Sequence, residues 1–254
     1  MDSLRSGLMD YWRLWEASGN SESTVGRNTL TDNNTVTGNP GIVLNARQFT
    51  RASSERLSLA STADVQSGDI DFTVACWVYL DSTPAGIMYA MGKDGTGAGT
   101  REWRVMWNNA DSLLTFSIFK AVDTAASVTA ATLGAPATAT WYFITAWHDA
   151  VGDTVNIEVN MGGADSAATG GAAQAASTAE FAIGARSAGT LFWDGRICEA
   201  AKWNRILSRP ERWWLYNSGK GRSYPFDGRM SLAMMGRGRG QMGRRRSHAS
   251  GIIY

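Results

Sequence analysis

Short runs of β-forming residues, separated by clusters of Gly, Asn, Asp, Ser and Thr, repeat along most of this 254-residue chain. The run 71–80 has apolar residues at both odd and even positions, which is typical of a strand covered on both faces. The run 154–161 alternates, and its pattern predicts two faces: inward Val155, Ile157, Val159 and Met161, and outward Thr154, Asn156, Glu158 and Asn160. Further strands are predicted at 86–92, 102–107, 113–120, 141–148, 180–184 and 195–203.

A single segment has the features of a helix. Ser208 and Glu211 have the spacing of a capping box, with a proline in the first turn, and Gly219 suits a left-handed C-terminal position. Two segments rich in Ala, Thr, Ser and Gly, 124–140 and 162–178, are interpreted as small-residue strands and loops rather than flexible linkers. Many short strands and one helix near 208–218 predict an all-β sandwich.

Charge divides the chain into two parts. Residues 1–227 carry 18 basic and 23 acidic side chains, whereas residues 228–254 carry no acid. The basic side chains of this second part are Arg229, Arg237, Arg239, Arg244, Arg245 and Arg246. A Gly/Arg/Met-rich segment buries too little apolar surface to fold alone. We therefore predict one folded domain, 1–227, followed by an extended basic C-terminal arm, 228–254.

Aromatic residues, cysteines and apolar runs narrow the picture further. Eleven tryptophans indicate an aromatic core, an aromatic binding surface, or both, and Trp77 and Trp141 are expected to be largely buried. Cys76 and Cys198 lie in apolar runs, which favours two buried free thiols over one disulfide. No apolar run approaches the ~20 residues of a membrane span. The first residues lack the features of a signal peptide, so we expect synthesis in a host cytoplasm.

Several segments, in their order along the chain, resemble a laminin-G-like domain of the concanavalin-A-like lectin/glucanase superfamily. They include Tyr11-Trp12-Arg-Leu-Trp15, the run 71–78, and Gly195-x-Ile197 followed by Trp203-Asn-Arg-x-Leu-Ser208, which is the most specific. The resemblance covers about residues 8–220 and implies a jelly-roll sandwich of two antiparallel sheets. The family commonly has Asp where this chain has Cys198, so any role of that carboxylate is missing here.

Catalytic patterns are absent from the sequence. Hydrolases on this sandwich place carboxylates as Glu-x-Asp-x-x-Glu along one strand, because a glycosidase needs two acids on one face. Here Glu102, Glu158, Glu180 and Glu199 stand alone, and His148 is interpreted as a packed residue rather than a base. The sequence contains no metal-spaced His/Cys cluster. We therefore do not expect an enzyme.

Sugar binding remains open, since sugar rings stack on aromatic side chains. The candidate residues are Tyr89, Trp103, Trp107, Asn108 and Asn109, beside the glycine-rich loop 92–99. In the alternative interpretation, Trp103 and Trp107 belong to one buried face of a strand. Asp94 is a candidate calcium ligand in the same loop, although a single acid is a weak basis for a calcium site.

Three roles are open to the arm: contact with a protein partner, contact with nucleic acid, or a solvated tail. Interleaved Met and Gly, and an apolar end formed by Ile252, Ile253 and Tyr254, favour a groove on a protein partner. A single domain of this kind with an arginine-rich arm is similar to virion structural proteins of tailed bacteriophages. The resemblance implies a multi-copy or homo-oligomeric capsid-decoration or tail-associated virion protein, with glycans as further ligands. A free carbohydrate-binding module and a degenerate glycan hydrolase are the alternatives.

Overall fold

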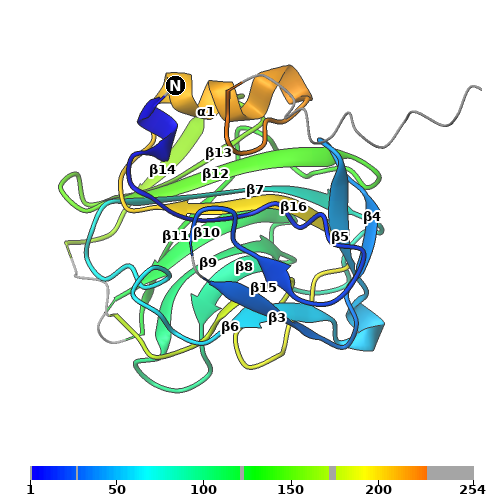
Figure 1. Cartoon of the computed structure of the whole chain (residues 1–254). Coiled ribbons are helices and arrows are strands. Elements are labelled where there is room, and N and C mark those ends of the chain that lie inside the picture. Colours follow the sequence, from blue (N-terminus) through cyan, green and yellow to red (C-terminus); the bar gives the residue numbers. More distant parts are fainter. Residues whose placement is uncertain (1, 27, 121–122, 172–175, 228–254) are drawn as a thin grey trace, which may run out of the picture.

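The computed structural model describes residues 2–26, 28–120, 123–171 and 176–227. Two eight-stranded antiparallel sheets face each other in a sandwich (Figure 1). The first sheet contains β14 (Ala164–Ala168), β13 (Thr154–Val159), β12 (Trp141–Asp149), β7 (Phe72–Leu80), β16 (Gly195–Trp203), β5 (Asn45–Phe49) and β4 (Thr37–Pro40), with β1 (Leu8–Trp12) paired to β16. The second contains β11 (Ala125–Thr129), β10 (Leu113–Phe119), β9 (Arg101–Asn108), β8 (Met88–Asp94), β15 (Phe181–Ile183), β6 (Arg56–Leu59), β3 (Thr29–Asn33) and β2 (Ser21–Glu22).

The predicted all-β jelly-roll sandwich is confirmed, with every strand predicted from the sequence found near its predicted position. The two small-residue segments contain β11 and β14, which contact each other where the edges of the two sheets meet. The six strands before residue 71 have no long apolar run in their sequences. Five of them lie toward the sheet edges: β4 and β5 in the first sheet, and β2, β3 and β6 in the second. Short 3-10 turns occur at Asp2–Arg5, Arg51–Ser53 and Asn217–Gly219. No helix in the described part of the chain is long and apolar enough to cross a membrane.

The hydrophobic residues form two layers. One lies between the sheets and contains Trp12, Trp103 and Trp193. The other covers the outer face of the first sheet and contains Trp77 and Phe143, beneath the helix α1 (Arg209–Tyr216). Cys76 belongs to the first layer and Cys198 to the second, and both thiols are free as the sequence favoured.

The prediction of burial is confirmed for Trp77, whereas Trp141 is less deeply buried. Only 2% of the Trp77 surface is exposed, because Tyr216 of α1 stacks on its ring at a centroid distance of 5.8 Å. Trp141 lies at the start of β12, is only partly buried, and packs on Tyr79 at 5.3 Å. An apolar strand pattern shows which residues share a face, but it does not show how deeply each one is covered.

Helix α1 begins with the predicted capping box, in which the Ser208 N–H donates to Glu211 Oε2 at 2.8 Å. It ends two residues before the expected Gly219, since Asn217 already adopts the left-handed conformation with φ of 50°. Figure 1 shows α1 lying on the outer face of the first sheet, beside β12 and β13. The helix therefore closes the second apolar layer.

This helix overturns one prediction on β13. Glu158, expected to face solvent, is 1% exposed, and Asn156 is also buried. Arg212 of α1 packs on the outer face of the sheet. Its Nε lies 2.7 Å from Glu158 Oε2, and its guanidinium carbon lies 4.3 Å from the ring centroid of Trp147. The alternation correctly separates two faces of β13, but the polar face is covered by the helix.

Candidate functional site

The aromatic rings proposed for sugar stacking lie inside the protein. Trp103 and Trp107 are 0% and 3% exposed and point from β9 into the layer between the sheets, together with Val105. Tyr89 of β8 is also buried. None of these rings has a free face for a sugar, so the predicted stacking role is wrong for them and the alternative of a buried strand face holds.

The two asparagines of the same candidate set lie at the far end of β9. Asn108 is partly buried, and its side-chain oxygen accepts the Ala110 N–H at 3.3 Å. Asn109 is exposed in the turn that leads to β10. The structure therefore does not unite the five predicted residues in one binding site.

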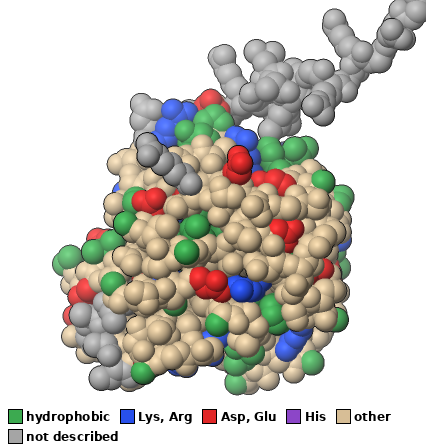
Figure 2. All heavy atoms as spheres, turned by 60° about the horizontal axis from the view of Figure 1, so that its bottom comes forward, with side chains coloured by type: hydrophobic (Ala, Val, Ile, Leu, Met, Phe, Trp, Pro, Cys, Tyr) green, Lys and Arg blue, Asp and Glu red, His purple; other side chains and the backbone are tan. Residues whose placement is uncertain are grey.

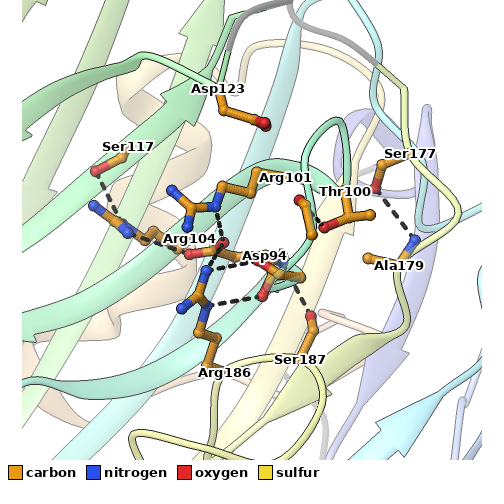
Figure 3. Close-up of polar contacts among 12 residues, drawn as sticks. Asp94, Thr100, Arg101, Arg104, Ser117, Asp123, Ser177, Ala179, Arg186 and Ser187 are labelled. Atoms are coloured by element: carbon orange, nitrogen blue, oxygen red, sulfur yellow. Dashed lines mark hydrogen bonds and ion pairs between the residues drawn. The ribbon is translucent and has the colours of Figure 1, made fainter.

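A polar cluster is centred on the buried carboxylate of Asp94 (Figure 3). Its Oδ2 accepts from the Tyr89 hydroxyl at 2.6 Å and from Arg104 at 3.2 Å. Its Oδ1 accepts from Arg186 at 3.1 Å and lies 3.5 Å from Arg101 Nε. Burial raises the pKa of Tyr89 to about 12, so the hydroxyl stays protonated and donates.

The calcium role considered for Asp94 does not fit this environment. Both carboxylate oxygens already accept from cationic or phenolic donors, and three guanidinium groups surround one carboxylate. Calcium is held by several oxygen ligands with excess negative charge. Among the described residues, no group of three or more His, Cys, Asp or Glu side chains is placed to share a metal ion.

A shallow depression of about 440 Å³ lies beside this cluster. One wall is the loop between β8 and β9, with Thr96 and Thr100, and Ser187 lies opposite. The ion pair between Arg56 and Glu180 completes the lining. The hydroxyls of Thr100 and Ser187 already donate to the carbonyls of Gly97 and Glu180. The depression therefore offers the Thr96 hydroxyl, one cation and one anion to a ligand.

Buried contacts fix both walls of the depression. The loop is closed by the Gly95 N–H, which donates to the Thr100 carbonyl at 2.9 Å, and Arg186 donates to the Gly95 carbonyl at 2.6 Å. Behind the other wall, the buried Lys93 Nζ lies 2.7 Å from Glu102 Oε1. That carboxylate also accepts the Ser177 N–H at 2.6 Å. The site is thus prearranged by the fold.

Charged side chains are thinly spread over the face of the molecule that Figure 2 shows. Hydrophobic side chains are scattered there too, and acidic and basic side chains occur singly or in small groups. Of the described residues that line the depression, Glu180 supplies its one carboxylate, and that carboxylate is paired with Arg56. A glycosidase requires two carboxylates flanking the bond that breaks, one of them free to act as acid. The geometry suits binding better than hydrolysis.

Sequence reasoning missed Arg101, Arg104 and Arg186. Arg101 and Arg104 flank Trp103 in the sequence, and the alternation of a strand points Arg104 away from the core. That signal indicates an exposed cation but not a cluster. Arg186 follows β15, and only the pairing of β15 with β8 brings it to Asp94.

A family model described as the concanavalin A-like lectin/glucanases superfamily matches residues 51–211. The chain belongs to this superfamily. It is thus a lectin-like jelly-roll domain, as the resemblance implied, although the superfamily includes both binding proteins and enzymes. No curated protein sequence matches the chain.

Two solved structures that are similar to this chain are binding domains of toxins. The binding domain of Paraclostridial Mosquitocidal Protein 1 matches with a TM-score of 0.68 and 10% identity over 84% of this chain and 52% of that one. The binding domain of botulinum neurotoxin serotype G matches with a TM-score of 0.65 and 12% identity, covering 82% and 50%. This chain spans about half the length of these toxin domains.

A third similar structure has nearly the same extent as this chain. It is domain 4 of AbnA, an extracellular arabinanase from Geobacillus stearothermophilus, solved in complex with arabinotriose. The TM-score is 0.60 and the identity 13%, over 85% of this chain and 99% of that one. At such identities these likenesses establish the shared fold alone.

Proposed function

We propose that this chain is a non-enzymatic glycan-binding domain and that the depression beside Thr96 and Thr100 receives the sugar. The observation that carries the proposal is the set of polar groups on the lining, in which the Thr96 hydroxyl and the Arg56–Glu180 pair supply both donors and acceptors. The volume lies within the ~300–1,000 Å³ of ligand pockets. The pairing of Glu180 with Arg56 favours binding over hydrolysis, and the similar toxin structures are binding domains.

A glycan array with the full chain tests this function, followed by titration of each glycan that binds. Filling the depression through Ala179→Trp should weaken binding at least about tenfold, because the bulky ring occupies the volume meant for the sugar. Ala110→Trp is the matched control, since Ala110 is exposed in the turn at the opposite end of β9.

The proposal fails if no glycan on the array binds, or if the Ala179→Trp protein remains folded and binds as well as the unchanged protein. Release of reducing ends from a polysaccharide would instead support the alternative of a degenerate hydrolase. If Ala110→Trp binds as well as the unchanged protein, the loss of binding in Ala179→Trp is specific to the depression.

We further propose that the domain is displayed on a virion, as a capsid-decoration or tail-associated protein, through residues 228–254. These residues lie outside the described part of the chain, so the proposal rests on their composition: six arginines, no acid and an apolar end at 252–254. The described domain supports a separable arm, because Phe226 is buried in the second apolar layer and its carbonyl accepts from Trp214 at 3.0 Å.

Deleting residues 228–254 should leave the melting temperature of the domain unchanged, since the packing of Phe226 remains intact. The same deletion should abolish incorporation into particles, measured by mass spectrometry of purified virions. Full occupancy of the truncated protein would show that attachment belongs to the sandwich. Absence of the full chain from particles would favour a free carbohydrate-binding module, and retention of nucleic acid by the arm would favour the nucleic-acid role.

A further inference from the structure

The cluster around Asp94 carries an excess of positive charge. Arg101, Arg104 and Arg186 each lie within ion-pair distance of its carboxylate, at 3.5, 3.2 and 3.1 Å. One carboxylate neutralises one guanidinium, so the cluster retains a formal charge of about +2. The other acids nearby are engaged elsewhere: Glu180 with Arg56 and Glu102 with Lys93.

Asp123 lies above Arg101 in Figure 3 but forms no ion pair with it. Its carboxylate accepts the Gly99 N–H at 2.8 Å, and no ion pair joins it to a described arginine. Each guanidinium has five N–H groups, so three arginines around one carboxylate have donors to spare for a further anion.

The three arginines differ in how many donors remain. Arg186 is committed to Asp94 and to the Gly95 carbonyl, and Arg104 to Asp94, to Tyr89 at 2.7 Å and to Ser117 at 3.4 Å. Arg101 donates no hydrogen bond to any described residue, and 30% of its side chain is exposed. Arg101 is therefore the arginine of the cluster most available to a ligand.

Aromatic packing holds this arginine in place. The guanidinium carbons of Arg101 and Arg104 lie 5.3 and 4.9 Å from the ring centroid of Phe119 in β10. Cation–π contact with a buried ring restricts both side chains before any ligand arrives. Prior restriction lowers the entropy lost on binding.

We propose that Arg101, supported by Arg104 and Arg186, forms a second subsite that binds the anionic group of an acidic glycan, a carboxylate or a sulfate. The planar guanidinium suits both anions. Gly95 and Ser187, which line the depression, adjoin Asp94 and Arg186, so one oligosaccharide can place a neutral ring in the depression and its acidic group against Arg101. This inference rests on the proposed glycan-binding function.

Titration calorimetry with three matched oligosaccharides tests the subsite: one neutral, one carrying a uronic acid and one carrying a sulfate ester. At least one acidic ligand should bind at least about tenfold more tightly than the neutral one, as expected for a charge-assisted hydrogen bond. Arg101→Gln should remove this preference and leave the affinity for the neutral ligand unchanged. Raising the salt concentration should weaken only the acidic ligand.

Arg209→Gln is the matched control, because the Arg209 side chain is 66% exposed on α1, on the other side of the sandwich. Preference for the uronate or for the sulfate identifies which anion the subsite takes. Equal affinity for all three ligands, unchanged by Arg101→Gln, would overturn the subsite while leaving the depression as a neutral sugar site. Binding of none of the three, nor of any glycan on the array, would overturn both proposals.

Discussion

Replacing Trp77 with alanine should lower the free energy of unfolding by about 3–5 kcal/mol, the usual cost of truncating a large buried aromatic residue. The ring lies between the first sheet and α1, stacked on Tyr216 and 5.1 Å from Phe143. The cavity left behind is bounded by a sheet on one side and a helix on the other. Denaturant unfolding monitored by circular dichroism measures the loss.

Trp141→Ala provides an internal comparison. Trp141 is the same residue type on the adjacent strand β12, but it is only partly buried. Its truncation should cost roughly 1 kcal/mol, a typical value for a point substitution. A loss of less than about 1 kcal/mol for Trp77→Ala, or equal losses for both variants, would contradict the second apolar layer described here.

The sequence predicted the sandwich well because strands and their turns leave local signals. The uninterrupted apolar run of β7 and the alternation of β13 each report a periodicity that depends only on neighbouring residues. The exposure of individual side chains was harder to predict, since it depends on elements that are distant in the sequence. Glu158 lies on the polar side of β13, and its burial follows from the position of α1, whose Arg212 pairs with it.

The candidate site was poorly predicted for a related reason. Asp94 and Arg101 come together because β8 and β9 are paired, and Arg186 joins them through β15. No short motif encodes this convergence. Trp103 and Trp107 were attractive as sugar ligands because of their residue type, yet their spacing of four along a strand places both on the buried face.

Glu199 connects the outer face of the first sheet to the C-terminal segment 221–227. Its Oε2 accepts from the Tyr11 hydroxyl, and that hydroxyl also lies 3.3 Å from the Arg222 carbonyl. Arg13 donates to the Tyr224 carbonyl at 2.8 Å. The other carboxyl oxygen, Glu199 Oε1, has no well-formed hydrogen bond among the described residues. A buried carboxyl group with one unpaired oxygen favours the neutral form.

Stability should therefore fall as the pH rises. Burial raises the pKa of Glu199 from 4.5 to about 7, although the hydrogen bond from Tyr11 opposes this shift. Between these values the unfolded chain releases a proton that the folded protein keeps, so ionisation favours unfolding. The contribution of Glu199 is complete below about pH 4.5 and is lost by about pH 7, a loss on the order of 3 kcal/mol.

Other shifted groups bear on the same experiment. Burial raises the pKa of Asp10 to about 6, which adds a decline of the same sign at lower pH. Burial lowers the pKa of Lys202 to about 8, so above that pH the folded protein loses this proton before the unfolded chain does. The resulting gain in stability with rising pH therefore lies above the range of this experiment. Glu199→Gln separates these contributions, because the amide keeps an acceptor for Tyr11 and does not titrate.

Unfolding free energies measured at pH 5, 6 and 7 should thus decline less steeply in Glu199→Gln than in the unchanged protein. Hydrogen exchange should show residues 221–227 opening more readily at pH 7 than at pH 5 in the unchanged protein, because the ionised carboxylate lies beneath them. Equal pH slopes in the two proteins would mean that Glu199 is already ionised in the folded state at pH 5. In that case solvent or an unrecognised cation reaches the carboxylate, and the C-terminal segment packs on the sheet less closely than the structure indicates.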